Sequence, residues 1–154
     1  MKIVKKYLGY YPNIQIMPLE NGNIAIFNDV HENGFSSMYA TIYDSYGNVL
    51  MDAAKVAEYE TQSNSAVSAF PGGGFVIAYT NSPRGVPLSK RTTIVKHFDS
   101  SLQQVGSSVS IRTPLIFQIL VRARGDVLVA YPKYPNGKNG DYTSSKLMGQ
   151  FMTP

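Results

Sequence analysis

A glycine turn followed by a short apolar strand occurs three times along this chain. The copies are Gly22-Asn23-Ile24-Ala25-Ile26-Phe27, Gly73-Gly74-Phe75-Val76-Ile77-Ala78-Tyr79 and Gly125-Asp126-Val127-Leu128-Val129-Ala130-Tyr131. Their leading glycines stand 51 and 52 residues apart. A period of this length is typical of repeat architectures, in which each repeat is one supersecondary unit that stacks on its neighbours. We therefore expect three similar units.

Strand-like segments on both sides of each copy extend the repeat into a four-stranded unit. A first strand precedes each glycine turn, at residues 14–16, 65–67 and 117–119. A third strand follows each glycine strand, at residues 39–45, 94–100 and 146–151, and the first two units continue into a fourth strand, at residues 48–51 and 105–111. Glycine adopts positive φ without strain, which suits a tight hairpin between the first two strands. The pattern predicts all-β, antiparallel units, whose strands we term a, b, c and d in chain order.

An aromatic residue followed by Asp and Ser ends the third strand of the first two units. The two copies are Tyr43-Asp44-Ser45 and Phe98-Asp99-Ser100, which are 55 residues apart. An Asp side chain accepts hydrogen bonds from the backbone of the turn that it opens, so we predict this role for Asp44 and Asp99. In the third unit, Phe151 stands 53 residues after Phe98 and aligns with it by spacing.

The fourth strand of the last unit is displaced in the sequence. No such strand follows residues 146–151, whereas residues 2–8 carry a strand-like pattern ahead of the first unit. The strand order along the chain is then d, abcd, abcd, abc. We predict that residues 2–8 complete the last sheet, because an uncovered sheet edge promotes aggregation. We expect one domain, 1–154, with units at about 9–58, 59–111 and 112–154.

The combination of glycine turn, Phe-Val-Ile-Ala-Tyr strand, loop, strand ending in Phe-Asp and polar turn resembles the repeats of bacterial β-propeller domains with four-stranded blades. Propellers usually close with about 4–8 blades, so three are too few for one ring. Either two chains form a six-bladed ring as a homodimer, or the three units close as a β-trefoil or β-prism. The chain has no Trp and no Gln-X-Trp trefoil signature. In the dimer, the N-terminal strand of one chain would pair with the strand of Phe151 in the other.

The predicted b–c connections are long and polar, at about residues 28–37, 81–91 and 132–145. Amides, carboxylates, arginines and tyrosine rings are the groups that bind sugars, phosphates or a protein surface. The candidate ligand-binding residues are Asn28, Asp29, His31, Asn81, Arg84, Arg91, Tyr134, Asn136, Asp141 and Tyr142. We expect a non-enzymatic, lectin-like module that recognises a glycan or another surface ligand. The alternative is a structural subunit of a larger assembly, such as a bacterial or phage particle, whose loops bind no small ligand.

Signatures of catalysis are missing from the sequence. The chain has no Cys, which excludes disulfides, thiolate metal sites and cysteine nucleophiles. His31 and His97 are the only histidines, too few for a metal site without carboxylates. No Gly-X-Ser-X-Gly elbow or phosphate-binding loop is present. We predict no catalytic residue, metal or cofactor.

Charge and hydropathy bear on partners and location. The net charge of +4 favours an acidic partner, such as an acidic protein surface, but the basic residues are scattered, so we do not expect nucleic-acid binding. No apolar run is long enough to span a bilayer, and the first residues lack the apolar core of a signal peptide. The sequence leaves open whether the protein is cytoplasmic or released without a classical signal.

Overall fold

The computed structural model describes residues 14–32, 34–59, 65–81, 83, 85–87, 90–113, 116, 118–133 and 146–152. The strands in this part of the chain are β1 (Ile14–Pro18), β2 (Ile24–Glu32), β3 (Phe35–Tyr43), β4 (Val49–Tyr59), β5 (Ser65–Phe70), β6 (Gly74–Asn81), β7 (Thr92–Phe98), β8 (Gln104–Ile111), β9 (Gln118–Val121), β10 (Val127–Lys133) and β11 (Lys146–Met152). The all-β expectation is confirmed. No helix among these residues is long and apolar enough to cross a membrane.

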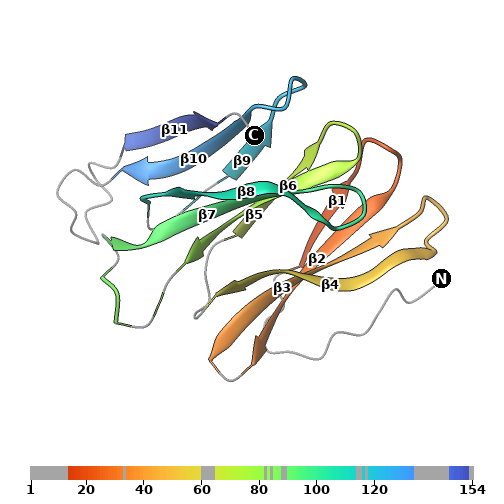
Figure 1. The fold of residues 1–154 in the computed structure, drawn as a ribbon, viewed down its shortest axis with the longest axis horizontal. Coiled ribbons are helices and arrows are strands. Elements are labelled where there is room, and N and C mark those ends of the chain that lie inside the picture. Colours follow the sequence, from red (N-terminus) through yellow and green to blue (C-terminus); the bar gives the residue numbers. More distant parts are fainter. Residues whose placement is uncertain are drawn as a thin grey trace.

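The strands form three antiparallel sheets that follow one another along the chain (Figure 1). Sheet A has the order β1-β2-β3-β4, sheet B has β5-β6-β7-β8, and sheet C has β9-β10-β11 within the described residues. Within each sheet, strands that follow one another in the sequence pair with each other, as the a-b-c-d pattern predicts. The predicted d strand of the third unit, residues 2–8, lies outside the described residues.

The a–b turns place the repeat glycines in one conformation. Gly22, Gly73 and Gly125 have φ angles of 81°, 94° and 92°. Each donates its N–H to the carbonyl three residues earlier, as Gly22 does to Leu19 at 3.0 Å. Other residues rarely adopt such φ angles, which explains why glycine recurs at this position.

The c–d turns of sheets A and B are built in the same way. Asp44 Oδ1 accepts hydrogen bonds from the N–H groups of Tyr46 and Asn48, at 2.9 and 2.8 Å. Asp99 Oδ1 accepts from the two equivalent N–H groups at 2.8 and 2.9 Å. These bonds confirm the predicted role of both aspartates. The side-chain hydrogen bond from Asn48 and those from the backbone lower the pKa of Asp44.

The connection between β2 and β3 corrects one expectation. The sequence predicts a long loop over residues 28–37, but β2 continues to Glu32 and β3 begins at Phe35. Asp29 pairs with Met38 and Glu32 with Phe35 in unbroken register, and Gly34 allows the tight turn with a φ of 82°. Polar residues suggested a loop, yet a strand tolerates them where the hairpin extends beyond the sheet core. The described residues between β6 and β7 (83, 85–87, 90 and 91) lie outside any strand, as expected of a loop, and residues 134–145 lie outside the described residues.

The pairing of β11 corrects a second expectation. Spacing aligns Phe151 with Phe98, but Phe98 pairs with Phe75, two residues after its repeat glycine. Phe151 pairs with Leu128, three residues after its repeat glycine. The residue of sheet B at this later position is His97, one residue before Phe98. A shift of one residue moves a side chain to the other face of a sheet, so Phe151 lies on the outer face of sheet C.

Sheet B packs between sheets A and C. On one side, the Phe75 ring of β6 meets Phe27 of β2 edge-on, with centroids 4.9 Å apart, and stacks on Phe98 at 5.3 Å. On the other side, Val76 and its alternate neighbours on β6 join the apolar layer formed with sheet C. Because β6 is buried on both faces, its sequence is continuously apolar rather than alternating.

The a strands of the three sheets lie side by side in the stack (Figure 1). Gln15 of β1 donates from Nε2 to the Ser65 hydroxyl of β5 at 3.1 Å. Ser68 of β5 accepts from the N–H of Val121 of β9 at 3.3 Å. Each of these bonds joins the a strands of two neighbouring sheets, so β5 is tied to β1 on one side and to β9 on the other.

We predict that replacing Asp99 with Ala lowers the free energy of unfolding by about 1–2 kcal/mol, because two backbone N–H groups lose their acceptor. Asp99→Asn is the matched control, since its amide oxygen can still accept both bonds. Urea unfolding followed by circular dichroism measures the difference. Equal losses for both variants would contradict the role of the carboxylate oxygen as a backbone acceptor.

Candidate functional site

The candidate residues of the first unit lie on β2 and point in different directions. Successive strand residues face opposite sides of a sheet, so Asn28 lies on the outer face of sheet A, while Asp29 and His31 are on the side of sheet B. Asn28 is only 1% exposed, and its Oδ1 has no hydrogen-bond partner in the part of the chain that the structure describes. His31 is exposed, and its Nδ1 lies 2.9 Å from the Ser36 hydroxyl. These three residues do not form one surface.

The candidates of the second unit lie at the mouth of the β6–β7 loop. Asn81 ends β6 and pairs with Thr92, the first residue of β7, so Arg91 is close to it. Both candidates are half-buried. Arg91 donates from Nε to the Val86 carbonyl at 3.3 Å, which ties the loop to its base.

The remaining candidates are Arg84, Tyr134, Asn136, Asp141 and Tyr142, and they lie outside the described residues. Their proposed role therefore stays a prediction. Among the described side chains, no group of three His, Asp or Glu residues could hold a metal ion.

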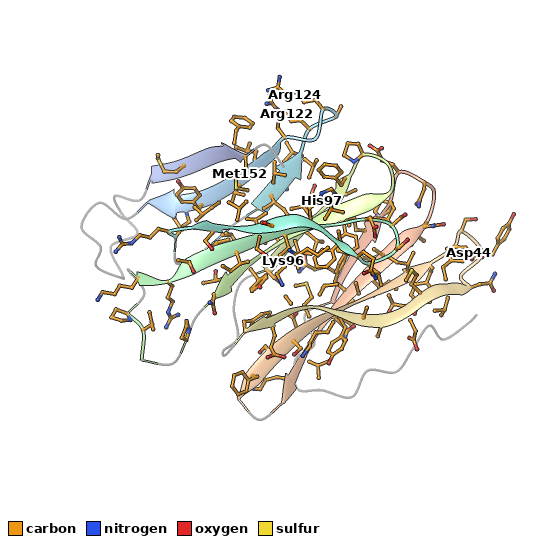
Figure 2. All side chains as sticks on the ribbon, in the orientation of Figure 1. Asp44, Lys96, His97, Arg122, Arg124 and Met152 are labelled. Carbon is orange, nitrogen blue, oxygen red and sulfur yellow. The ribbon has the colours of Figure 1, made fainter. Side chains whose placement is uncertain are left out.

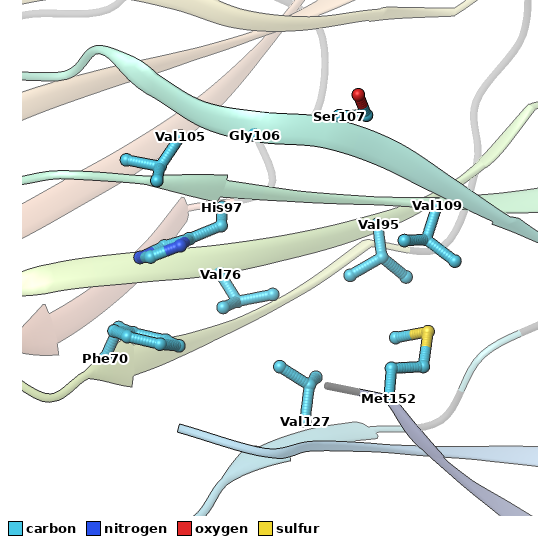
Figure 3. A pocket seen from close by; sticks show the side chains of 10 residues that line it. All are labelled: Phe70, Val76, Val95, His97, Val105, Gly106, Ser107, Val109, Val127 and Met152. Carbon is cyan, nitrogen blue, oxygen red and sulfur yellow. The ribbon is translucent and has the colours of Figure 1, made fainter. Parts of the chain in front are cut away.

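A cavity of about 110 Å³ lies between sheet B and strands β10 and β11 of sheet C. Val105 and Val109 of β8 point into it from one side, with Val127 of β10 and Met152 of β11 opposite (Figure 3). The lining is almost entirely apolar, with Ser107 as its one hydroxyl residue. Such a site suits aliphatic side chains better than a polar substrate.

His97 is the titratable residue of this cavity. Its ring lies against Phe70, with centroids 3.9 Å apart, and its buried Nδ1 has no hydrogen-bond partner among the described residues. Burial lowers the pKa of His97, and the charge of Asp99 offsets part of this effect. The neutral imidazole is therefore the dominant form at pH 7.

The β9–β10 turn carries a charged cluster at the tip of sheet C (Figure 2). Asp126 is buried and accepts hydrogen bonds from Arg124 and Arg122, which lower the pKa of its carboxyl group. The Arg122 guanidinium also lies 4.5 Å from the centroid of the Phe151 ring. The cluster fixes the turn and places a cation–aromatic pair on the outer face of sheet C.

Apolar side chains on the outer faces of sheets A and C are the feature that sequence reasoning missed. Sheet A exposes Ile14, Ile16 and Ile24, and sheet C exposes Leu120 and Phe151. Aligning the glycine strands by their leading glycine marks one position on each face, because Ile24 matches Phe75 and Leu128 matches Val76, and both of these sheet B residues are in the core.

No family model, curated protein or solved structure matches this chain.

We predict that His97 titrates below pH 6.5, the value of an unperturbed histidine. A lowered pKa in the folded state means that the unfolded chain binds protons more readily than the folded chain. The contribution of neutral His97 to the free energy of unfolding is therefore complete above pH 6.5 and is lost as the pH falls through the folded pKa. The melting temperature of the wild type should therefore fall between pH 7.5 and pH 5. In His97→Phe, which has no imidazole to protonate at this position, the fall should be smaller. NMR titration of the His97 ring gives the pKa directly, and a value at or above 6.5 would contradict its burial.

Proposed function

We propose that this chain is a non-enzymatic binding module that works as a closed ring of propeller blades, with two copies supplying three blades each. The observation that supports this is the match between the two outer faces of the stack. The contact between sheets A and B has two sides, one from each sheet. The outer face of sheet A carries apolar residues at the positions of one side, and the outer face of sheet C carries them at the positions of the other.

The outer face of sheet A corresponds to the face that sheet B presents to sheet A. Counted from the repeat glycines, Ile24 matches Phe75, and Ile16 matches Val67 by the same spacing of 51 residues. Phe75 and Val67 pack in the layer between sheets A and B. Ile16, in contrast, is 67% exposed.

The outer face of sheet C corresponds to the face that sheet A presents to sheet B. Leu128 stands three residues after its repeat glycine, as Ala25 and Val76 do, and both of these are buried against the next sheet. Leu120 and Phe151 flank Leu128 on the neighbouring strands and are 54% and 58% exposed. Exposed apolar groups that line up across three strands mark an interaction surface.

Two such chains can satisfy both faces at once. When sheet C of each copy packs on sheet A of the other, a twofold axis closes a ring of six sheets, within the range of about 4–8 blades that propellers use. The a strands would then surround the ring axis, and the contacts of β5 with β1 and with β9 within one chain support this arrangement. The trefoil alternative has a closed barrel, whereas the three described sheets are open.

In the ring, the b–c connections of all blades lie on one side, so this is the side that we assign to recognition. The β6–β7 loop and the segment of residues 134–145 carry most of its polar groups. Together with the net charge of +4, they favour a glycan or an acidic protein surface as the ligand.

We expect light scattering to give a mass of about twice the 16.9 kDa of one chain. Leu120→Glu places a charge in the proposed contact and should weaken dimerisation by about a hundredfold or more. Tyr46→Glu is the control, because Tyr46 is 87% exposed and lies on the β3–β4 turn rather than on a strand of either proposed contact face. A wild-type monomer at ~100 μM would refute the ring, since a contact of this size is expected to bind more tightly. An unchanged dimer in Leu120→Glu would refute this surface.

We expect the dimer to bind acidic or neutral glycans on an array, and Arg84→Ala and Tyr134→Ala to weaken binding without changing the mass. Lys55→Ala, on β4, serves as the control for loss of a surface cation. Absence of binding to every glycan, with the dimer intact, would contradict recognition and favour the structural-subunit alternative.

A further inference from the structure

We propose that residues 2–8 of a second copy form the fourth strand of sheet C, where they pair with β11 and cover the cavity between sheets B and C. This inference rests on the proposed ring. It adds the specific element by which one copy completes a sheet of the other.

The position next to β11 is open in the described part of the chain. β11 pairs with β10 along its whole length, from Lys146 to Met152. In sheets A and B, the corresponding c strand has a partner on both sides, because β4 pairs with β3 and β8 with β7. A strand edge with free N–H and C=O groups is a template for pairing with another chain.

Apolar side chains of β8, across the cavity from sheet C, are left exposed where a fourth strand of sheet C would lie. Val105 and Val109 on β8 are apolar but 44% and 40% exposed, and they line the cavity. Its counterpart β4 has Val56 and Tyr59 buried, with Tyr59 against Tyr79 of sheet B at a ring distance of 5.6 Å. A strand beside β11 would cover the two valines of β8, which removes apolar surface from water.

The spacing of the repeat identifies the segment that fits there. The d strands β4 and β8 end at Tyr59 and Ile111, and the next a strand begins six and seven residues later. The segment of residues 2–8 ends six residues before β1 begins at Ile14 and 51 residues before Tyr59. Its distance from the next a strand is therefore the distance expected of a d strand.

The order of the sheets assigns this strand to another copy. β4 lies in sheet A but immediately precedes β5 of sheet B, so a d strand belongs to the sheet before the a strand that follows it. Residues 2–8 precede β1 of sheet A and thus belong to the sheet that packs on the outer face of sheet A. In the proposed ring, that sheet is sheet C of the second copy.

The composition of the segment suits an outer edge strand. Ile3, Val4, Tyr7 and Leu8 supply apolar side chains toward the neighbouring sheets, and its three lysines remain able to reach solvent. Lysines on an edge strand oppose further pairing, which would limit the assembly to the ring.

The absence of native cysteine makes cross-linking specific. A chain carrying Lys5→Cys is mixed with a chain carrying Met148→Cys on β11, and a short bismaleimide is added. We expect a covalent dimer in the mixture and background levels in either variant alone. The control mixture replaces Met148→Cys with Asn21→Cys, an exposed position on the β1–β2 turn. Equal yields in the two mixtures would overturn the proposal.

Both cysteines placed in one chain, diluted into excess wild-type protein, test the same-chain alternative. A cross-linked monomer in that sample would overturn exchange between copies, and a cross-link to the wild type is impossible because it has no Cys. If light scattering shows the dimer but the mixture does not cross-link, the strand assignment fails and the ring stands. A wild-type monomer would make both fail.

Deleting residues 1–8 gives a second readout. We expect dimerisation to weaken by about tenfold or more, through the loss of main-chain bonds and apolar burial. A synthetic peptide of residues 1–12 added to the truncated chain should restore the dimer. A truncated chain that dimerises as tightly as the full chain would overturn the proposal.

Discussion

The burial of β6 on both faces is the constraint on which this structure depends. Phe75 and Ile77 pack toward sheet A, and Val76 and Ala78 pack toward sheet C. A sheet that is apolar on both faces is stable only when both are covered. Sheets A and C supply that cover, and their own outer faces expose apolar side chains such as Ile16 and Leu120. In the proposed dimer, each copy would cover the outer faces of the other.

Contacts between successive a–b turns set the direction of the stack. The N–H of Gly72 donates to the carboxylate of Glu20 at 3.2 Å, which joins the turn of sheet B to that of sheet A. A Cβ at Gly73 would lie 2.6 Å from the Asn21 side chain, and one at Gly125 would lie 3.2 Å from the Phe70 ring. The glycines thus serve both the turn conformation and the close approach of the preceding sheet.

Local rules in the sequence were sufficient to predict the hairpins but not the outer faces. The glycine and Asp turns follow from backbone conformation and hydrogen bonding within about five residues. The sequence of the β2–β3 hairpin does not distinguish it from a loop, because its polar residues are common in both. The register of Phe151 depends on pairing with β10, which spacing does not determine. Which sheets end the stack is a property of packing between sheets, so the two outer faces could be identified only from the structure.

The absence of native Trp allows a direct test of the central claim, that a second copy covers the outer face of sheet A. A single Trp introduced as Ile16→Trp on β1 reports the polarity around that face. The account predicts blue-shifted emission at high protein concentration and a red shift on dilution, at the concentration where the dimer dissociates. Emission typical of a solvent-exposed indole at every concentration, in a chain whose circular dichroism is unchanged, would contradict the account.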